Sequence, residues 1–183
     1  GGVDAQAALK LVKKWFDPIP AGTKYVRNLP KEPNQITARS KTVYKDVPQD
    51  AFYLAWPMAA KYTDAYYAAD LLSDVFSRGN SSRFNVEIVQ KSEVFSQLDA
   101  FITGELECGL FVISGKLMPG KTAEEAENLI QQAISKFISE GFYPRELDKL
   151  KNKIEATLRF QNLQVLNKAM HLAFCELAGD AAN

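Results

Sequence analysis

The fold is decided by one stretch of the chain, LLSDVFSRGNSSRFNVEIVQKSEVFSQLDAF, which covers residues 71–101. The apolar residues before Gly79 repeat at helical spacing, and a glycine at that place is typical of a helix end. Residues 83–91 then predict a short helix, and residues 95–103 predict a strand. This succession of helix, turn, short helix and strand predicts a fold that mixes helices with a sheet.

Outward from this stretch, pairs of strands alternate with helices. Thr122 and Glu125 have the spacing of a capping box, which marks the start of the clearest helix. Predicted helices cover residues 4–16, 63–78, 122–141, 144–158 and 166–177, predicted strands cover 37–47, 51–56 and 109–117, and residues 18–35 form an extended connection. Short turns between paired strands predict an α+β fold, with an antiparallel β-sheet backed by helices on one face. We expect a single domain over residues 1–183, and both ends read as cut from a longer protein.

Composition excludes several classes of protein. The chain has 183 residues, of which 46% are hydrophobic, and its 22 basic groups balance its 22 acidic ones. Such a chain has enough apolar residues for a core and is not disordered. The charge balance and the lack of a basic block argue against binding nucleic acid. No run of about 18 apolar residues predicts a membrane span, and the N-terminus does not read as a signal peptide.

The residues offer little metal-binding or catalytic chemistry. His171 and Cys175 are four apart on a predicted helix, a spacing that two metal ligands can use, but a site needs three or four ligands. The other thiol, Cys108, is distant in sequence, and whether it pairs with Cys175 stays open. The lone histidine has no nucleophile in a recognisable motif near it, and the clustered carboxylates suit a turn and a helix start. We therefore predict no catalytic residue and no metal ligand in this chain.

One polar turn is a candidate contact site. Gly79 and Asn80 lead into Ser81, Ser82 and Arg83 at the start of the predicted short helix, where backbone N–H groups can hold an anion or a peptide carboxylate. The glycine pattern of a phosphate-binding loop is missing. The simpler interpretation is a capped helix start, and the alternative is a contact with a substrate or a partner domain.

The same segments resemble a known family. Three stretches, in this order, resemble the second domain of a zinc-peptidase half in the insulinase/pitrilysin (M16) family. They are GGVDAQAALKLVKKWFDPIPAG at residues 1–22, the stretch 71–101, and GLFVISGKLMPGKTAEEAENLIQQAISKFISEGFYPRELDKLKNKIEATL at residues 109–158. The resemblance covers about residues 2–180. It implies an M16 metallopeptidase-like α+β domain, with the preceding strand and the closing segment outside this chain.

The resemblance also implies that the chemistry lies elsewhere. In the family, an inverted His-x-x-Glu-His motif and a distant Glu hold zinc in another domain, and one histidine cannot supply that motif. Competent relatives often carry an Arg and, seven residues later, a Tyr that grip the substrate. Without gaps, those positions fall on Val89 and Ser96, which can do neither job. The resemblance thus implies no cofactor in this chain and zinc in the parent protein.

Three hypotheses for the function follow. The first is a non-catalytic domain that helps to wall the substrate chamber of a zinc-dependent M16 peptidase cleaving peptides or unfolded polypeptides. Its partners would be other M16 domains of the same chain or a partner subunit, and a peptide substrate. The alternative is an assembly module of an inactive M16-like subunit. A weaker third is an unrelated enzyme that uses carboxylates. We expect a soluble bacterial protein of the periplasm or the cytoplasm, without a choice between the two.

Overall fold

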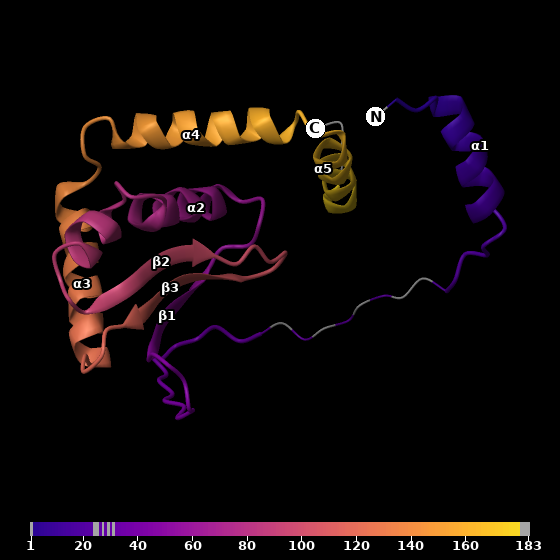
Figure 1. Cartoon of the computed structure of the whole chain (residues 1–183). Helices are drawn as coiled ribbons and strands as arrows, with labels where there is room; N and C mark the ends of the chain where they lie inside the picture. The colour runs from indigo at the N-terminus through magenta and orange to yellow at the C-terminus, as the bar shows by residue number, and fades with distance from the viewer. Residues whose placement is uncertain (1, 24–25, 27, 29, 31, 180–183) are drawn as a thin grey trace. The chain divides into compact units, whose positions relative to one another are not determined.

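The chain forms a three-stranded sheet and six helices in the part that the computed structural model describes, residues 2–23, 26, 28, 30 and 32–179 (Figure 1). Two compact units result, residues 38–158 and residues 1–37 with 159–183. The elements are α1 (Ala5–Phe16), β1 (Ala51–Met58), α2 (Asp64–Ser77), the π-helix η1 (Phe84–Val89), β2 (Phe95–Ile102), β3 (Gly109–Leu117), α3 (Ala123–Glu140), α4 (Glu146–Gln161) and α5 (Val165–Ala178).

The sheet is antiparallel, with the strand order β1-β3-β2. The β2–β3 pair is the hairpin that the sequence predicts. The strand β1 pairs with the far side of β3, with Leu54 opposite Ile113. A β-bulge between Phe95 and Gln97 shifts the register of β2 against β3. The α+β fold class is therefore confirmed, with β3 in the centre and β1 and β2 at the edges.

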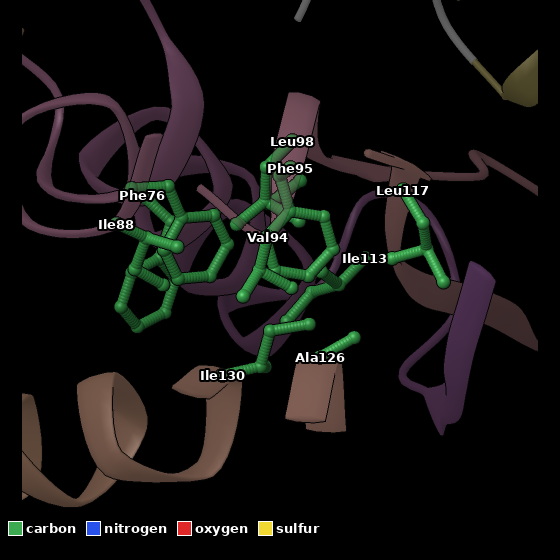
Figure 2. Close-up of a cluster of buried hydrophobic side chains, with 11 residues drawn as sticks. Phe76, Ile88, Val94, Phe95, Leu98, Ile113, Leu117, Ala126 and Ile130 are labelled. Atoms are coloured by element: carbon green, nitrogen blue, oxygen red, sulfur yellow. The ribbon is translucent and has the colours of Figure 1, made fainter. Parts of the chain in front are cut away.

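Helices cover one face of this sheet and build the core. Ile113 of β3 and Ile130 of α3 are fully buried, and Phe76 of α2 stacks on Phe84 of η1 with ring centroids 4.7 Å apart. Figure 2 shows Phe76, Ile113 and Ile130 within the cluster of buried side chains between the sheet and α3. The other face of the sheet stays open, since Tyr53, a residue of β1, is 67% exposed there. This agrees with the prediction of helices on one face.

Three local predictions differ from the structure. The strand expected over residues 37–47 is wrong, because residues 38–47 have no regular structure and Tyr44 is 92% exposed. A strand needs a neighbour for its backbone hydrogen bonds, and no described strand lies against this segment. The short helix over 83–91 is a π-helix over Phe84–Val89, with wider turns than an α-helix. The helix expected from Pro144 begins at Glu146, because Arg145 has a positive φ of 64° that a helix cannot include.

The second unit contains α1, α5 and the connection after α1. Asp4 caps α1 by accepting a hydrogen bond from the Ala7 amide, as the sequence predicts. Neither α1 nor α5 has a buried residue, and both carry large exposed apolar side chains such as Trp15 and Leu177. The predicted connection over residues 18–35 falls partly outside the described residues, as do residues 1 and 180–183 at the two ends. No described helix is long and apolar enough to cross a membrane.

Candidate functional site

The three candidate residues of the polar turn before η1 differ in their exposure to solvent. Ser81 is exposed and accepts a hydrogen bond from the Lys149 ammonium of α4. Ser82 and Arg83 are each only 4% exposed. The prediction of a contact with a substrate or a partner domain stays a prediction, and Ser81 is the member of the three that solvent reaches. Arg83 is instead the centre of an internal network.

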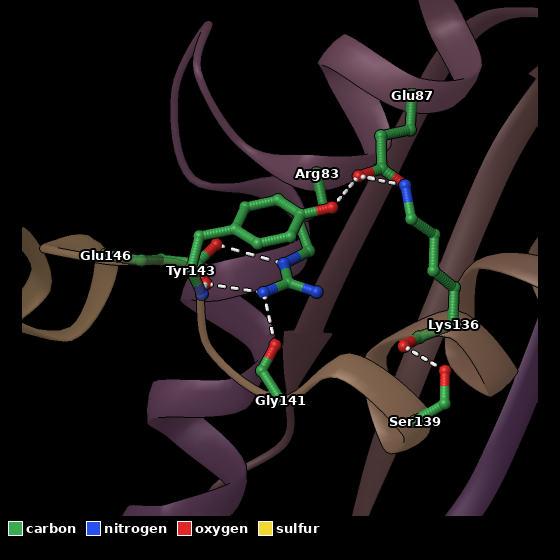
Figure 3. A network of polar contacts seen from close by, with 7 residues as sticks. All are labelled: Arg83, Glu87, Lys136, Ser139, Gly141, Tyr143 and Glu146. Atoms are coloured by element: carbon green, nitrogen blue, oxygen red, sulfur yellow. Dashed lines mark hydrogen bonds and ion pairs between the residues drawn. The ribbon is translucent and has the colours of Figure 1, made fainter.

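Arg83 joins η1 to the loop between α3 and α4. Its Nε donates to Glu146 Oε1 at 3.0 Å, and its Nη2 donates to Glu146 Oε2 at 2.7 Å (Figure 3). The same Nη2 donates to the Gly141 carbonyl at 2.6 Å. Two parallel bonds between a guanidinium and a carboxylate form a strong and directional pair. Arg83 therefore fixes both the end of α3 and the start of α4.

Aromatic rings enclose the guanidinium. Its Cζ lies 3.9 Å from the ring centroid of Tyr143 and 4.8 Å from that of Phe137. A cation above an aromatic face is attracted by the ring quadrupole, and the rings also exclude water. The Arg83 side chain is only 3% exposed as a result, while that of Glu146 is 13% exposed. This is a buried ion pair, whose integrity depends on both partners.

A second ion pair extends the network to Lys136 in the C-terminal part of α3. The Tyr143 hydroxyl donates to Glu87 Oε1, and Lys136 Nζ lies 3.1 Å from the same oxygen (Figure 3). Glu87 belongs to η1, whereas Lys136 belongs to α3. The network therefore links η1 to α3 as well as to α4. The network stabilises the structure around the turn. Both of its carboxylates, those of Glu87 and Glu146, are bonded to other members of the network, and neither lies free beside a nucleophile.

The loop from Gly141 to Glu146 has the backbone that this geometry needs. Gly141 ends α3 with a φ of 70°, which favours glycine, and its amide donates to the Phe137 carbonyl. The Tyr143 amide donates to Glu146 Oε2 at 3.0 Å. These turns direct the Gly141 carbonyl and the Glu146 carboxylate toward the same guanidinium. The sequence signal for this arrangement is weak, because Gly141 and Pro144 mark a loop without indicating which groups it directs toward Arg83.

The network favours the ionised forms of its two carboxylates and the neutral, protonated form of the Tyr143 phenol. Burial raises the pKa of Glu146, but the hydrogen bonds from Arg83 and from the Tyr143 amide, with the Arg83 charge, outweigh it, so that this pKa lies below its usual value. Burial likewise raises the pKa of Glu87, and hydrogen bonds from Tyr143 and Lys136 outweigh it and lower this pKa. For Tyr143, the hydrogen bond to Glu87 is the largest cause of a raised pKa. No member of the network is thereby poised as a base near neutral pH.

The metal-ligand candidates do not assemble into a site. Cys175 Sγ lies 3.9 Å from His171 Nε2, as expected for residues four apart on a helix. Within residues 2–23, 26, 28, 30 and 32–179, no group of three or more His, Cys, Asp or Glu side chains could hold a metal ion. Cys108 and Cys175 are free cysteines.

The two positions aligned with substrate-gripping residues lie on different elements, Val89 at the end of η1 and Ser96 in β2. Val89 packs against the core and lines a shallow hollow with Phe95 and Met118. Ser96 donates through its Oγ to the Lys116 carbonyl at 3.3 Å. Neither side chain offers a positive charge or a phenol at this place. Ser92, Glu93 and Lys121 also line this hollow.

These observations define an α+β domain in which a polar network has a structural role. Its described part contains no assembled metal site. The family model for the Peptidase M16 inactive domain matches residues 1–154. The chain belongs to this family, and the resemblance seen in the sequence is confirmed. No curated protein sequence matches the chain.

Solved structures agree with this assignment. A protease from Helicobacter pylori is similar over 98% of this chain and 44% of its own, with 26% identity and a TM-score of 0.87. A peptidase M16 inactive domain from Pseudomonas fluorescens is similar over 57% of this chain and 26% of its own, with 20% identity and a TM-score of 0.52. The periplasmic protease PqqL from Escherichia coli is similar over 96% of this chain and 19% of its own, with 13% identity and a TM-score of 0.63. This chain thus spans less than half the length of the Helicobacter pylori protease.

Proposed function

We propose that this chain is a non-catalytic domain that helps to wall the substrate chamber of a zinc-dependent M16 peptidase. The peptidase would cleave peptides or unfolded polypeptides. The observation that carries the proposal is the match to an inactive M16 domain in a chain whose polar network around Arg83 is internal. Arg83 is used to hold three helices together, so its charge serves the shape of the domain.

Zinc and the catalytic base would come from another domain in this proposal. The described residues contain no cluster of three metal ligands, and His171 with Cys175 supplies two at most. The partners would be other M16 domains of the same protein or a partner subunit. Exposed apolar side chains of α1 and α5, such as Trp15 at 65% and Leu166 at 71%, support such packing, because uncovered apolar surfaces commonly mark interfaces.

An assembly role without peptidase activity is the second candidate. Val89 and Ser96 support it, because they occupy the positions where competent relatives carry an Arg and a Tyr. A chain without these two groups suits either the second domain of the zinc-bearing half or a subunit that has lost activity.

Zinc content and peptide cleavage test the proposal. We expect purified residues 1–183 to hold no stoichiometric zinc by elemental analysis and to leave a quenched fluorescent peptide intact, with or without added zinc. The whole parent protein should cleave the peptide and lose this activity to a chelator. Stoichiometric zinc, or chelator-sensitive cleavage by residues 1–183 alone, would contradict the proposal. A whole protein without zinc or cleavage would favour the assembly role.

A further inference from the structure

Two loops form a hollow at the end of the sheet where β2 begins and β3 ends. One loop joins η1 to β2 and the other joins β3 to α3, and the Met118 amide of the second loop donates to the Val94 carbonyl of the first at 2.8 Å. The hollow has a volume of about 480 Å³, within the range of about 300–1,000 Å³ that is usual for small-ligand sites. All its lining residues fall between positions 89 and 121, so the whole hollow belongs to the unit of residues 38–158.

Part of the lining of this hollow is apolar. Phe95 is buried, and its ring lies 2.6 Å from the place where a Cβ of Gly115 would stand, so the lack of a side chain at Gly115 makes room for the ring. Val89, Met118 and Pro119 complete the apolar lining. Val89 packs against the core, whereas Met118 is exposed. An apolar group that enters the hollow would therefore gain free energy by removing this surface from water.

Three polar residues also line the hollow, and each has an unused polar group. The Oγ of Ser92 is buried and has no hydrogen-bond partner among the described residues. Glu93 and Lys121 carry opposite charges, and within the part of the chain that the structure describes neither has an ion-pair partner. The Glu93 carboxylate and the Lys121 ammonium thus do not pair with each other. The hollow therefore presents two unpaired charges of opposite sign beside an apolar surface.

We propose that this hollow is a binding site for a free α-amino acid with an apolar side chain. The Glu93 carboxylate would pair with the ammonium group of the ligand, and the Lys121 ammonium would pair with its carboxylate. The side chain of the ligand would cover Val89 and Met118. Ser92 supplies an unused hydroxyl at the same hollow. The inference is independent of the peptidase proposal, because it uses only the contacts and charges of this hollow.

The two charges select the class of ligand. An α-amino acid carries one charge of each sign on groups attached to the same carbon, so it satisfies Glu93 and Lys121 together. A fatty acid or an amine satisfies one of them, and the interior of a peptide chain satisfies neither. Glu93 is exposed and Lys121 is half-buried, so water weakens each of the two pairs. We therefore expect a Kd in the millimolar range, and a loss of affinity of about two- to fivefold when one charge is removed.

An NMR titration of isotope-labelled residues 1–183 with L-leucine tests the site. We expect saturable changes in the amide chemical shifts of Ser92, Glu93 and Lys121. N-acetyl-L-leucine amide keeps the apolar side chain and lacks both charges. It should therefore bind about four- to 25-fold more weakly, which is the product of the two single losses.

Substitutions at the hollow separate this site from general binding of leucine. Glu93→Gln and Lys121→Gln should each weaken binding about two- to fivefold, and Met118→Trp should fill the hollow and abolish binding. Glu107→Gln is the matched control, because it removes an exposed carboxylate outside the hollow and should leave the affinity unchanged. The absence of saturable shifts with L-leucine would overturn the inference. So would equal affinity for the uncharged analogue, or equal effects of Glu93→Gln and Glu107→Gln.

Discussion

Replacing Arg83 by Met tests whether the buried network stabilises the domain. The substitution keeps much of the side-chain volume and removes the positive charge. It would leave the Glu146 carboxylate, 13% exposed, with the Tyr143 amide as a remaining hydrogen-bond donor. It would also remove the bond to the Gly141 carbonyl.

The expected loss follows from the burial of both charges. Breaking a buried ion pair by removing one partner costs about 3–5 kcal/mol, because the other charge stays uncompensated. Glu146 keeps one donor and some contact with water, so we expect the lower end, about 3 kcal/mol of the free energy of unfolding. For a chain of this size, that is a decrease in Tm of about 6–12 °C.

Urea unfolding followed by circular dichroism measures this loss. Arg78→Met is the matched control, because Arg78 pairs with Asp74 at the surface and its side chain is 43% exposed. Exposed ion pairs contribute at most about 1 kcal/mol, so the control should change stability little. The double variant Arg83→Met with Glu146→Met should lose clearly less than the sum of the two single changes, since it buries no unpaired charge.

The reasoning fails if Arg83→Met and Arg78→Met cost the same, or if the two changes at Arg83 and Glu146 add independently. Either result would mean that Arg83 contributes packing alone and that its charge is not coupled to Glu146 in the folded chain.

Three further predictions concern pH, the core and a helix start. The pKa values of Glu146 and Glu87 are lowered by folding, so the unfolded chain binds more protons, and stability should decrease as the pH falls below the ordinary glutamate value of 4.5. Urea midpoints that are unchanged between pH 6 and pH 3 would contradict this. Ile130→Ala should cost about 2–5 kcal/mol at a fully buried position, whereas Ile138→Ala, at a residue 76% exposed, should cost less than about 0.5 kcal/mol by the same assay. Thr122→Ala removes the capping box of α3 and should cost about 1 kcal/mol, so an unchanged midpoint would contradict the cap's contribution.

Local patterns were enough to predict most helices and the β2–β3 hairpin. The capping box at Thr122 and Glu125 exists as predicted, and Ala126 and Ile130 of the apolar stripe are buried. Such signals depend on residues that are neighbours in sequence, so they can be recognised in a single sequence without knowledge of the tertiary structure. The segment 37–47 shows the limit of this approach, since its Thr, Val and Tyr content suits a strand but a strand also requires a neighbour.

The role of Arg83 could not be predicted from its surroundings. Arginine is rarely buried, and the residues that pair with it or enclose it lie on other elements. The only nearby residue in the sequence that suggested an ion pair was Glu87, four residues after Arg83. In the structure Glu87 pairs with Tyr143 and Lys136. The polar-turn pattern grouped Ser81, Ser82 and Arg83 as one candidate contact site, whereas Ser82 and Arg83 are buried and Ser81 is exposed.

The distance in sequence between Arg83 and Glu146 has a consequence for folding kinetics. The bidentate pair joins residues 63 apart, with β2, β3 and α3 between them. Closing a loop of that length costs entropy before the pair gains anything, so we expect it to form after the hairpin and α3 have docked. Contacts that form after the transition state slow unfolding without speeding folding. The buried pair would then act chiefly on the unfolding rate, which sets how long the folded domain persists once it has formed.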